Sequence, residues 1–328
     1  MNGWSTTLQR AKRHTLAPAS LAALLVMGSV PCAQAQVGPA AAAVAAAGQT
    51  LEGRIWDVHA QQFIAPDVMF QRAASARYVL FGEKHDSPAH RARQLDMLQA
   101  LAQRGRSPAL AMEQLDSEYQ PALAAAQGAG VVDADALADA GQLNRKGWRW
   151  PMYRDLIGFA AAKHWPLFAA NLSRAEARKI ALGEVVPDIP AATRLQQTAL
   201  EDDVVQGHCG HRPEPARLAG IVAAQRARDA RMAQTLDSTP GPVVLMAGAG
   251  HVRADRAVPR YLAQPTQALA IALVEALPER AVPSDYDSAG FDLLWFTATQ
   301  PRPDACATPL PGLAAPAAVT LFVPRGKP

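Results

Sequence analysis

The sequence has 328 residues, of which 49% are hydrophobic, and it carries a formal net charge of +3. This length and apolar content allow one large domain or two small ones with a hydrophobic core. Residues 1–35 contain three basic residues and no acidic ones, so the rest of the chain has no net charge. The apparent basicity therefore gives no indication of a nucleic-acid partner, and we expect none.

The first 35 residues have the pattern of a secretory signal peptide. A basic segment (residues 10–13) precedes an apolar run over residues 16–30, and Ala33-Gln-Ala35 forms a small-x-small cleavage site. The apolar run is shorter than the ~20 residues that a membrane span requires. We expect cleavage near Ala35 and a periplasmic or secreted protein. Cys32 follows a poor lipid-attachment context, so no lipid anchor is expected.

Short apolar runs alternate with helical patterns over residues 51–300, which we expect to form the folded domain. Ser87-Pro88 marks a helix start, with a serine N-cap and a proline in the first turn, and Gly105 follows the last turn. The apolar runs predict strands at residues 53–58, 78–81, 109–113, 166–171, 243–247, 268–274 and 292–297.

Strands that alternate with helices are typical of an α/β fold, with a mainly parallel central sheet flanked by helices. Residues 116–163 have an interrupted helical pattern, and we expect them to form a helical cap insertion over the sheet. Ala-rich residues 36–50 are expected to be a flexible lead-in. The Pro- and Ala-rich C-terminal segment, residues 301–328, is expected to wrap the surface.

Cys209 and Cys306 are the two cysteines that remain after the expected cleavage. Two thiols in an oxidising compartment most simply form one disulfide. Such a bond would tie the loop around Cys209 to the C-terminal segment. A metal site is the alternative, because His208 and His211 lie close to Cys209 in the sequence.

Polar residues follow two of the predicted strands in the same pattern. Residues 78–81 lead into Gly82-Glu-Lys-His85, and residues 243–247 lead into Gly248-Ala-Gly-His251. We expect these two Gly-x-x-His segments to leave neighbouring strands of one parallel sheet. Because ligand sites in open α/β sheets lie outside the carboxyl ends of the strands, both histidines should reach the same crevice.

Other polar residues are expected at this edge of the sheet. Glu113 and Asn171 end two further strands, and Arg174 lies just beyond. Histidines with carboxylates can bind a divalent metal and activate water, or Glu83 can act as a general base. The same residues also suit haem. A histidine can bind the iron beside the aromatic residues of the insertion, and Lys84 and Arg174 can pair with the propionates, which need cationic donors.

The helix expected over residues 218–236 carries two polar residues in its apolar stripe. Gln225 and Asp229 lie one turn apart in that stripe, so both are expected to face inward and to need partners. They either cap backbone groups of a neighbouring element or line and brace the crevice.

Five segments, in matching order, together resemble the ChaN family, the haem-binding uptake branch of a superfamily that includes Tiki, TraB and erythromycin esterase-like proteins. The segments are Phe81–Asp86, Leu110–Glu113, Ala170–Arg174, Ala224–Met232 and Ala247–Val252. The resemblance implies an α/β fold and an exported protein of haem or iron uptake. A homodimer that shares haem and an outer-membrane haem receptor are further implied partners.

Tyrosinate ligation of the haem iron is associated with this branch, although no short motif identifies the tyrosine. Tyr153 is the first choice, because it lies among Trp148, Trp150 and Met152 of the insertion; ordinary packing is its alternative role. The residues expected to contact the cofactor are Lys84, His85, Tyr153, Asn171, Arg174, Gln225, Asp229 and His251.

The same superfamily implies a second possibility. Tiki-like relatives resemble metal-dependent proteases, and the matching positions are His85 and His251 as metal ligands, with Glu83 or Glu113. These residues are intact, so nothing in the sequence disables hydrolysis. Composition does not distinguish a haem-binding protein from a hydrolase with a divalent metal.

Overall fold

The computed structural model describes residues 50–303 and 306–307, which all belong to one unit, Gln49–Pro328. The expected signal peptide, residues 36–49 of the expected lead-in and most of the expected C-terminal segment lie outside the described residues. Within the described part, no helix is both long and apolar enough to span a bilayer.

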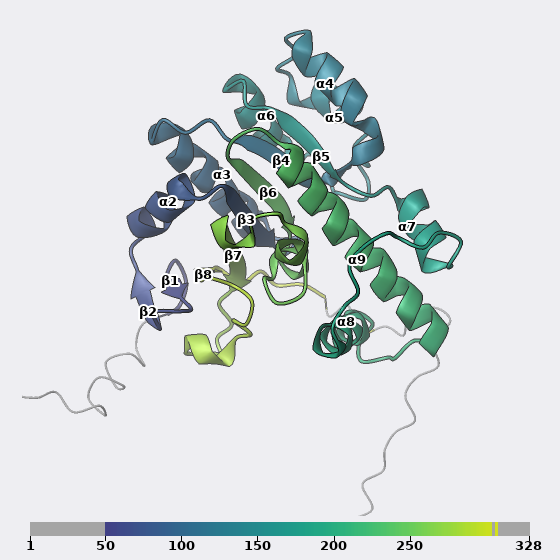
Figure 1. The fold of residues 1–328 in the computed structure, drawn as a ribbon. Helices are drawn as coiled ribbons and strands as arrows, with labels where there is room; N and C mark the ends of the chain where they lie inside the picture. The colour runs from purple at the N-terminus through teal and green to yellow at the C-terminus, as the bar shows by residue number, and fades with distance from the viewer. Residues whose placement is uncertain (1–49, 304–305, 308–328) are drawn as a thin grey trace, which may run out of the picture. The chain divides into compact units, whose positions relative to one another are not determined.

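The described residues contain one eight-stranded sheet in the order β2-β1-β8-β7-β3-β6-β4-β5 (Figure 1). The strands are β1 (Ile55–Asp57), β2 (Gln62–Ile64), β3 (Tyr78–Glu83), β4 (Ala109–Asp116), β5 (Leu167–Asn171), β6 (Val243–Gly248), β7 (Ala268–Glu275) and β8 (Leu293–Thr297). β3 pairs in parallel with both β6 and β7, and the antiparallel pairs of the sheet are the two that β1 forms, with β2 and with β8. The prediction of a mainly parallel sheet in an α/β fold is confirmed.

Helices follow most of the strands. The α-helices of the described part are α2 (Pro66–Ser75), α3 (Pro88–Gln103), α4 (Gln120–Gly128), α5 (Ala134–Ala140), α6 (Arg154–Ala162), α7 (Arg174–Ala181), α8 (Arg194–Gly207) and α9 (Pro215–Ser238). The short 3-10 helices are η1 (Ser117–Tyr119), η2 (Ala249–Val252), η3 (Val258–Tyr261), η4 (Pro265–Gln267) and η5 (Pro283–Asp285). Ser87 caps α3 as predicted, because its side chain accepts a hydrogen bond from the amide of His90.

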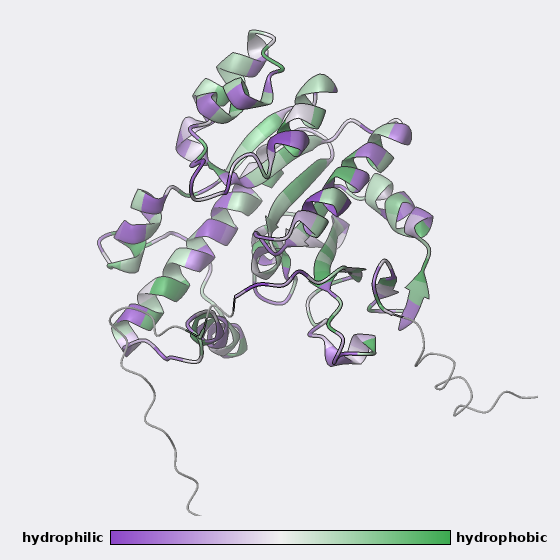
Figure 2. Ribbon diagram, turned by 180° about the vertical axis from the view of Figure 1, so that it is seen from behind, coloured by the Kyte–Doolittle hydropathy of each residue, from purple (hydrophilic) through white to green (hydrophobic). Residues whose placement is uncertain are grey.

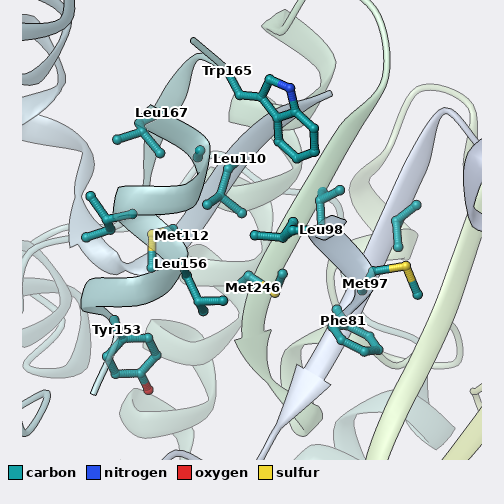
Figure 3. Packing of buried hydrophobic residues seen from close by; sticks show 14 of the residues in the cluster. Phe81, Met97, Leu98, Leu110, Met112, Tyr153, Leu156, Trp165, Leu167 and Met246 are labelled. Atoms are coloured by element: carbon teal, nitrogen blue, oxygen red, sulfur yellow. The ribbon is translucent and has the colours of Figure 1, made fainter. Parts of the chain in front are cut away.

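The two faces of the sheet are buried in separate cores, because successive residues of a strand face opposite sides. Val79 and Phe81 of β3 pack in a core with α3 and α6 (Figure 3), whereas Tyr78 and Leu80 pack in a core with Met232 and Leu236 of α9. Figure 2 accordingly shows hydrophobic colouring along the central strands and mixed colouring on the helices around them.

The insertion over residues 116–163 is helical, as predicted. It forms η1, α4, α5 and α6, of which α6 packs beside α3 and α4 lies against β5 (Figure 1). Two elements before β3, β2 and α2, were not predicted from the sequence. β2 has three residues with no fully buried side chain, and α2 follows Ala65, which provides no side-chain cap.

Cys209 and Cys306 form a disulfide, with Cα atoms 5.5 Å apart. The predicted pairing is therefore present, and it joins the loop between α8 and α9 to the C-terminal segment. The alternative of a metal site at this loop is wrong, because the bonded sulfur of Cys209 is not a free thiolate.

Candidate functional site

The carboxyl ends of β3, β6 and β4 meet at one edge of the sheet. β3 and β6 are neighbours, with Glu83 opposite Gly248, and β6 lies next to β4. The two Gly-x-x-His segments therefore leave adjacent parallel strands, as predicted. Their histidines, His85 and His251, approach the same carboxylate, that of Glu113 in β4.

The carboxylate of Glu83 is buried at the end of β3, with 2% of the residue exposed. Its Oε2 accepts a hydrogen bond from Gln94 (2.7 Å) and pairs with the guanidinium of Arg91. Its Oε1 accepts from the hydroxyl of Tyr153 (2.6 Å) and from Gln114 (3.3 Å). A buried carboxylate needs such partners, and together they hold Glu83 in one position.

His85 is held at Nδ1 by Glu83, and its Nε2 faces the carboxylate of Glu113. Its Nδ1 lies 2.7 Å from Oε1 of Glu83. Because a carboxylate only accepts, Nδ1 carries the proton and Nε2 keeps its lone pair when the ring is neutral. The side chain is 42% exposed, and its ring meets that of Trp148 edge-on, with 5.0 Å between centroids. Metal-ligating histidines are oriented by such a carboxylate partner.

Glu113 lies between the two histidines. Its Oε1 is 3.6 Å from Nε2 of His251, and its Oε2 is 3.8 Å from Nε2 of His85. The backbone amide of Gly248 also donates to Oε2, at 2.6 Å. Burial works to raise the pKa of Glu113, but His251, His85 and this amide outweigh it and hold the pKa below its usual range. Glu113 is therefore the anion at the centre of the site.

His251 is held by a second carboxylate. Its Nδ1 donates to Oδ1 of Asp229 on α9, at 2.6 Å. Burial works against the charged ring, but Glu113 and Asp229 outweigh it and raise the pKa of His251 to about 9. Burial also raises the pKa of Asp229 to about 6. At neutral pH His251 is thus a cation between two carboxylates, which leaves no free nitrogen for a metal.

The structure brings most of the predicted residues together. The side-chain amide of Asn171 donates to the backbone oxygen of Glu113 (2.9 Å), which fixes the end of β4. Lys84 instead forms an ion pair with Glu275 (3.3 Å). Arg174 is exposed in the first turn of α7, where no ion pair with another described residue is seen.

The prediction that Gln225 and Asp229 both face inward is half right. Asp229 is buried and braces His251, whereas Gln225 is exposed. Gln225 is exposed because it lines a cavity beside α9, where no other element covers its side chain.

Tyr153 is fully buried directly before α6, at the margin of the core in Figure 3. Its hydroxyl donates to Glu83, and burial raises the pKa of Tyr153 to about 12, so the side chain is neutral at neutral pH. An axial tyrosinate needs an ionised oxygen that faces the haem. This position therefore argues against Tyr153 as the iron ligand and agrees with its alternative role in packing.

Sequence reasoning missed the residues that hold Glu83 and Asn171. Arg91 and Gln94 lie on one face of α3, three residues apart, and Gln114 follows Glu113 in an apolar strand. Arg228 donates to Oδ1 of Asn171 at 2.7 Å. A polar residue at a buried position of a strand or helix was the available signal, because such a residue needs a partner.

Two cavities, each of about 330 Å³, border the histidines. The first is lined by His85, Asp86, Gly147, Trp148 and Arg149. The second lies between α8 and α9 and includes His208, Gln225, Asp229 and His251. A larger groove of about 1030 Å³, between α7, the loop after it and α9, contains neither histidine of the two Gly-x-x-His segments.

The expected divalent metal finds no support in the side-chain geometry. Within residues 50–303 and 306–307, no three His, Cys, Asp or Glu side chains are grouped so that they could hold a metal ion. Nε2 of each histidine faces Glu113, but the side chain of His251 is 15% exposed and that of His85 is 42% exposed, so His85 is the imidazole that a ligand can reach. One imidazole fits an axial ligand to haem iron better than a site for a free divalent ion, which takes ~3–4 protein ligands.

The family model described as "Haem-binding uptake, Tiki superfamily, ChaN" matches residues 69–262. The chain belongs to the ChaN haem-binding uptake family of the Tiki superfamily. A similar solved structure is that of ChaN from Campylobacter jejuni, which is described as binding haem cofacially. Its sequence is 25% identical to this chain, and the two structures superpose with a TM-score of 0.64 over 74% of this chain and 95% of that chain. This match confirms the predicted family and fold.

Two other solved structures are more distant from this ChaN-family chain. The type III effector HopBA1 is 13% identical, with a TM-score of 0.41 over 71% of this chain and 92% of that chain. A variant of erythromycin esterase EreC in its open conformation is 13% identical, with a TM-score of 0.35 over 64% of this chain and 72% of that chain. No curated protein matches the sequence.

The first cavity has the groups that a haem requires. His85 offers an imidazole nitrogen with a fixed tautomer, and Trp148 offers an aromatic wall. Arg149, also in the lining, is exposed and can pair with a propionate. The residues of this ChaN-family chain therefore fit the ligand named in the family description.

Proposed function

We propose that this ChaN-family protein is exported, binds haem and acts in haem or iron uptake. The observation that carries the proposal is the ring of His85, which is 42% exposed beside Trp148 and is oriented by Glu83, 2.7 Å from its Nδ1. Family membership supports haem as the ligand.

In this proposal the chain binds and orients haem, which supplies the iron. Nε2 of His85, which faces Glu113 at 3.8 Å in the structure, would hold the iron. Glu83 holds the proton at Nδ1 and makes the ring a stronger donor, and Arg91 and Gln94 keep Glu83 in place. Trp148 would contact the macrocycle, and Arg149 would pair with a propionate.

Export and uptake rest on the sequence and on one relative. The signal-peptide pattern expected over residues 1–35 supports a location in the periplasm or outside the cell. Cofacial haem binding is described for ChaN of Campylobacter jejuni. We extend this to a homodimer that shares haem and receives it from an outer-membrane receptor.

A haem titration of the chain from residue 36 onward tests the proposal. Haem is added stepwise, and the Soret absorbance is followed to saturation. Wild-type protein should give a saturable Soret shift, and His85→Ala should bind less haem at saturation. His164→Asn is the matched control, because His164 is exposed and asparagine tolerates its positive φ of 54°.

The outcomes separate haem binding from the ligand assignment. A wild-type protein without any Soret shift would refute the proposed function. Unchanged haem binding in His85→Ala would preserve the function and remove His85 as the ligand.

A further inference from the structure

The segment after β8 returns to the edge of the sheet that carries the site. Residues 298–303 and Cys306, which we call the strap, lead from the end of β8 to the loop between α8 and α9 (Figure 1). The hydroxyl of Thr299 donates to the backbone oxygen of Ala276, directly after β7. The disulfide between Cys306 and Cys209 fixes the other end. The strap is therefore held at both of its ends.

Arg302, in the middle of the strap, bridges two carboxylates. Its guanidinium donates two hydrogen bonds of 2.7 Å to Glu275 at the end of β7, and one of 2.8 Å to Asp86. The side chains of Arg302 and Glu275 are 19% and 9% exposed. A bidentate and partly buried pair of this kind is stronger than a single exposed ion pair. Arg302 therefore fixes Asp86 to the end of β7.

These contacts hold the residues on both sides of His85. Lys84 pairs with Glu275 (3.3 Å), and Asp86 pairs with Arg302 (2.8 Å). Although burial works to raise it, Arg302 and Lys84 hold the pKa of Glu275 below its usual range, so this carboxylate is charged at neutral pH. The loop that carries His85 is thus clamped, through its neighbours in the sequence, to one cluster of ion pairs.

Arg302 also offsets a negative charge that would otherwise face a bound haem. Asp86 lines the first cavity together with His85, Trp148 and Arg149. A carboxylate at this place repels the propionates of haem, and Arg302 neutralises it. Without Arg302 at its place, the His85 loop would be looser and Asp86 would oppose haem.

The disulfide keeps Arg302 beside its two carboxylates. Cys306 follows Arg302 by four positions, so the two Cα atoms are at most ~14 Å apart. An anchor at this short distance gives the guanidinium a high effective concentration at both carboxylates. A reductant can reach the bond, because Cys306 is exposed and Cys209 is half-buried. The redox state of the bond can therefore control the clamp on the site.

We propose that the Cys209–Cys306 disulfide controls the release of haem from His85, an inference that rests on the proposed haem-binding function. A thiolate of a dithiol reductant attacks one sulfur of the bond and forms a mixed disulfide, which the second thiolate of the reductant resolves. Two electrons pass to the cysteines, each of which takes up one proton, and the reductant ends as a disulfide. The strap then withdraws Arg302 from the cluster, and haem dissociates faster.

The test compares oxidised and reduced protein from residue 36 onward. Dithiothreitol reduces the bond, iodoacetamide blocks the two thiols, and both reagents are removed before haem is added; the oxidised sample receives iodoacetamide alone. Haem release is measured by transfer to excess apomyoglobin. Amide hydrogen exchange of residues 84–87 in the haem-free protein shows how firmly the loop is held, independently of haem.

Three variants complete the test. Cys209→Ser/Cys306→Ser lacks the bond, and Arg302→Gln lacks the clamp but keeps the bond. Arg256→Gln is the matched control, because Arg256 also bridges two carboxylates but does not line the first cavity. It donates two hydrogen bonds to Asp203 (2.7 and 2.8 Å) and one to Asp255 (2.7 Å).

Reduction of wild type should speed haem transfer about tenfold and raise the exchange rates of residues 84–87. The double serine variant should show both effects without reductant, Arg302→Gln should show them while oxidised, and Arg256→Gln should behave like wild type. Haem transfer or hydrogen exchange that is equal in oxidised and reduced wild type would overturn this inference and leave the proposed function standing. A wild-type protein without a Soret shift would overturn the proposed function itself, whereas the exchange rates would still decide whether the strap holds the loop.

Discussion

Gly248 has no side chain where the imidazole of His85 lies: a Cβ on Gly248 would be 2.8 Å from Nε2 of His85. Gly82, the glycine of the other Gly-x-x-His segment, lies equally close to the segment that begins at Gly248. A Cβ on Gly82 would be 2.5 Å from Cγ2 of Val252 and 2.9 Å from Cα of Ala249. Each Gly-x-x-His segment thus makes room for the other, and close approach explains why both begin with glycine.

We expect Gly248→Ala to displace His85 with little loss of stability. The imidazole is 42% exposed and can rotate away from the new methyl group. The free energy of unfolding should therefore fall by only about 1 kcal/mol. Haem at His85 should bind at least about tenfold more weakly, which is about 1.4 kcal/mol. Haem titration and urea unfolding measure the two effects. Gly128→Ala is the control, and equal haem affinity in both variants would contradict the assignment.

Tyr153→Phe should destabilise the protein but leave the haem spectrum unchanged. The substitution removes a 2.6 Å hydrogen bond to the buried carboxylate of Glu83, which typically costs about 1.5–3 kcal/mol. Because the hydroxyl faces Glu83, no iron ligand is lost. Urea unfolding measures the first effect and the Soret band the second, with the half-buried Tyr119→Phe as control. A Soret band that moves in Tyr153→Phe would contradict a role for this tyrosine in packing alone.

The fold and the centre of the site could be predicted because they depend on local patterns. Apolar runs that alternate with helical segments indicate a parallel sheet, and parallel strands bring their carboxyl ends to one edge. This reasoning placed Glu83, His85, Glu113 and His251 together, as the structure has them.

The finer geometry depends on contacts that no local pattern specifies. Tyr153 meets Glu83 across 70 residues, and nothing in the aromatic segment before it indicates that the hydroxyl turns inward. Lys84 follows Glu83 directly but pairs with Glu275, because successive residues point to opposite sides. The division of the site into two cavities likewise depends on how α8 and α9 pack.

Removing the disulfide should destabilise the fold. Cys209 and Cys306 are 97 positions apart, and a cross-link over such a distance typically contributes about 2–5 kcal/mol. The double variant Cys209→Ser/Cys306→Ser should therefore unfold at lower urea than wild type. Reductant should lower the wild-type midpoint and leave the variant unaffected. If wild type and variant unfold at the same urea concentration, the bond does not constrain the unfolded chain.

The protonated His251 should make the protein less stable as the solution becomes alkaline. Although burial opposes the charge, Glu113 and Asp229 raise the pKa of His251 to about 9, from 6.5 in an unfolded chain. Between these values the folded state holds a proton that the unfolded state has released, so the free energy of unfolding falls as pH rises. The pKa difference corresponds to about 3 kcal/mol. Asp229, with a pKa of about 6, is ionised throughout this window.

Asp229→Asn tests this origin of the pH dependence, because it removes one of the two carboxylates and keeps an oxygen for Nδ1 of His251. The pKa of His251 should fall, and the loss of stability between pH 6.5 and 9 should shrink. Urea unfolding across this window measures the loss, and the NMR shifts of the ring report its pKa directly. Asp202→Asn, on an exposed carboxylate of α8, should behave like wild type. Equal pH dependence in wild type and Asp229→Asn would show that the alkaline loss does not arise at His251.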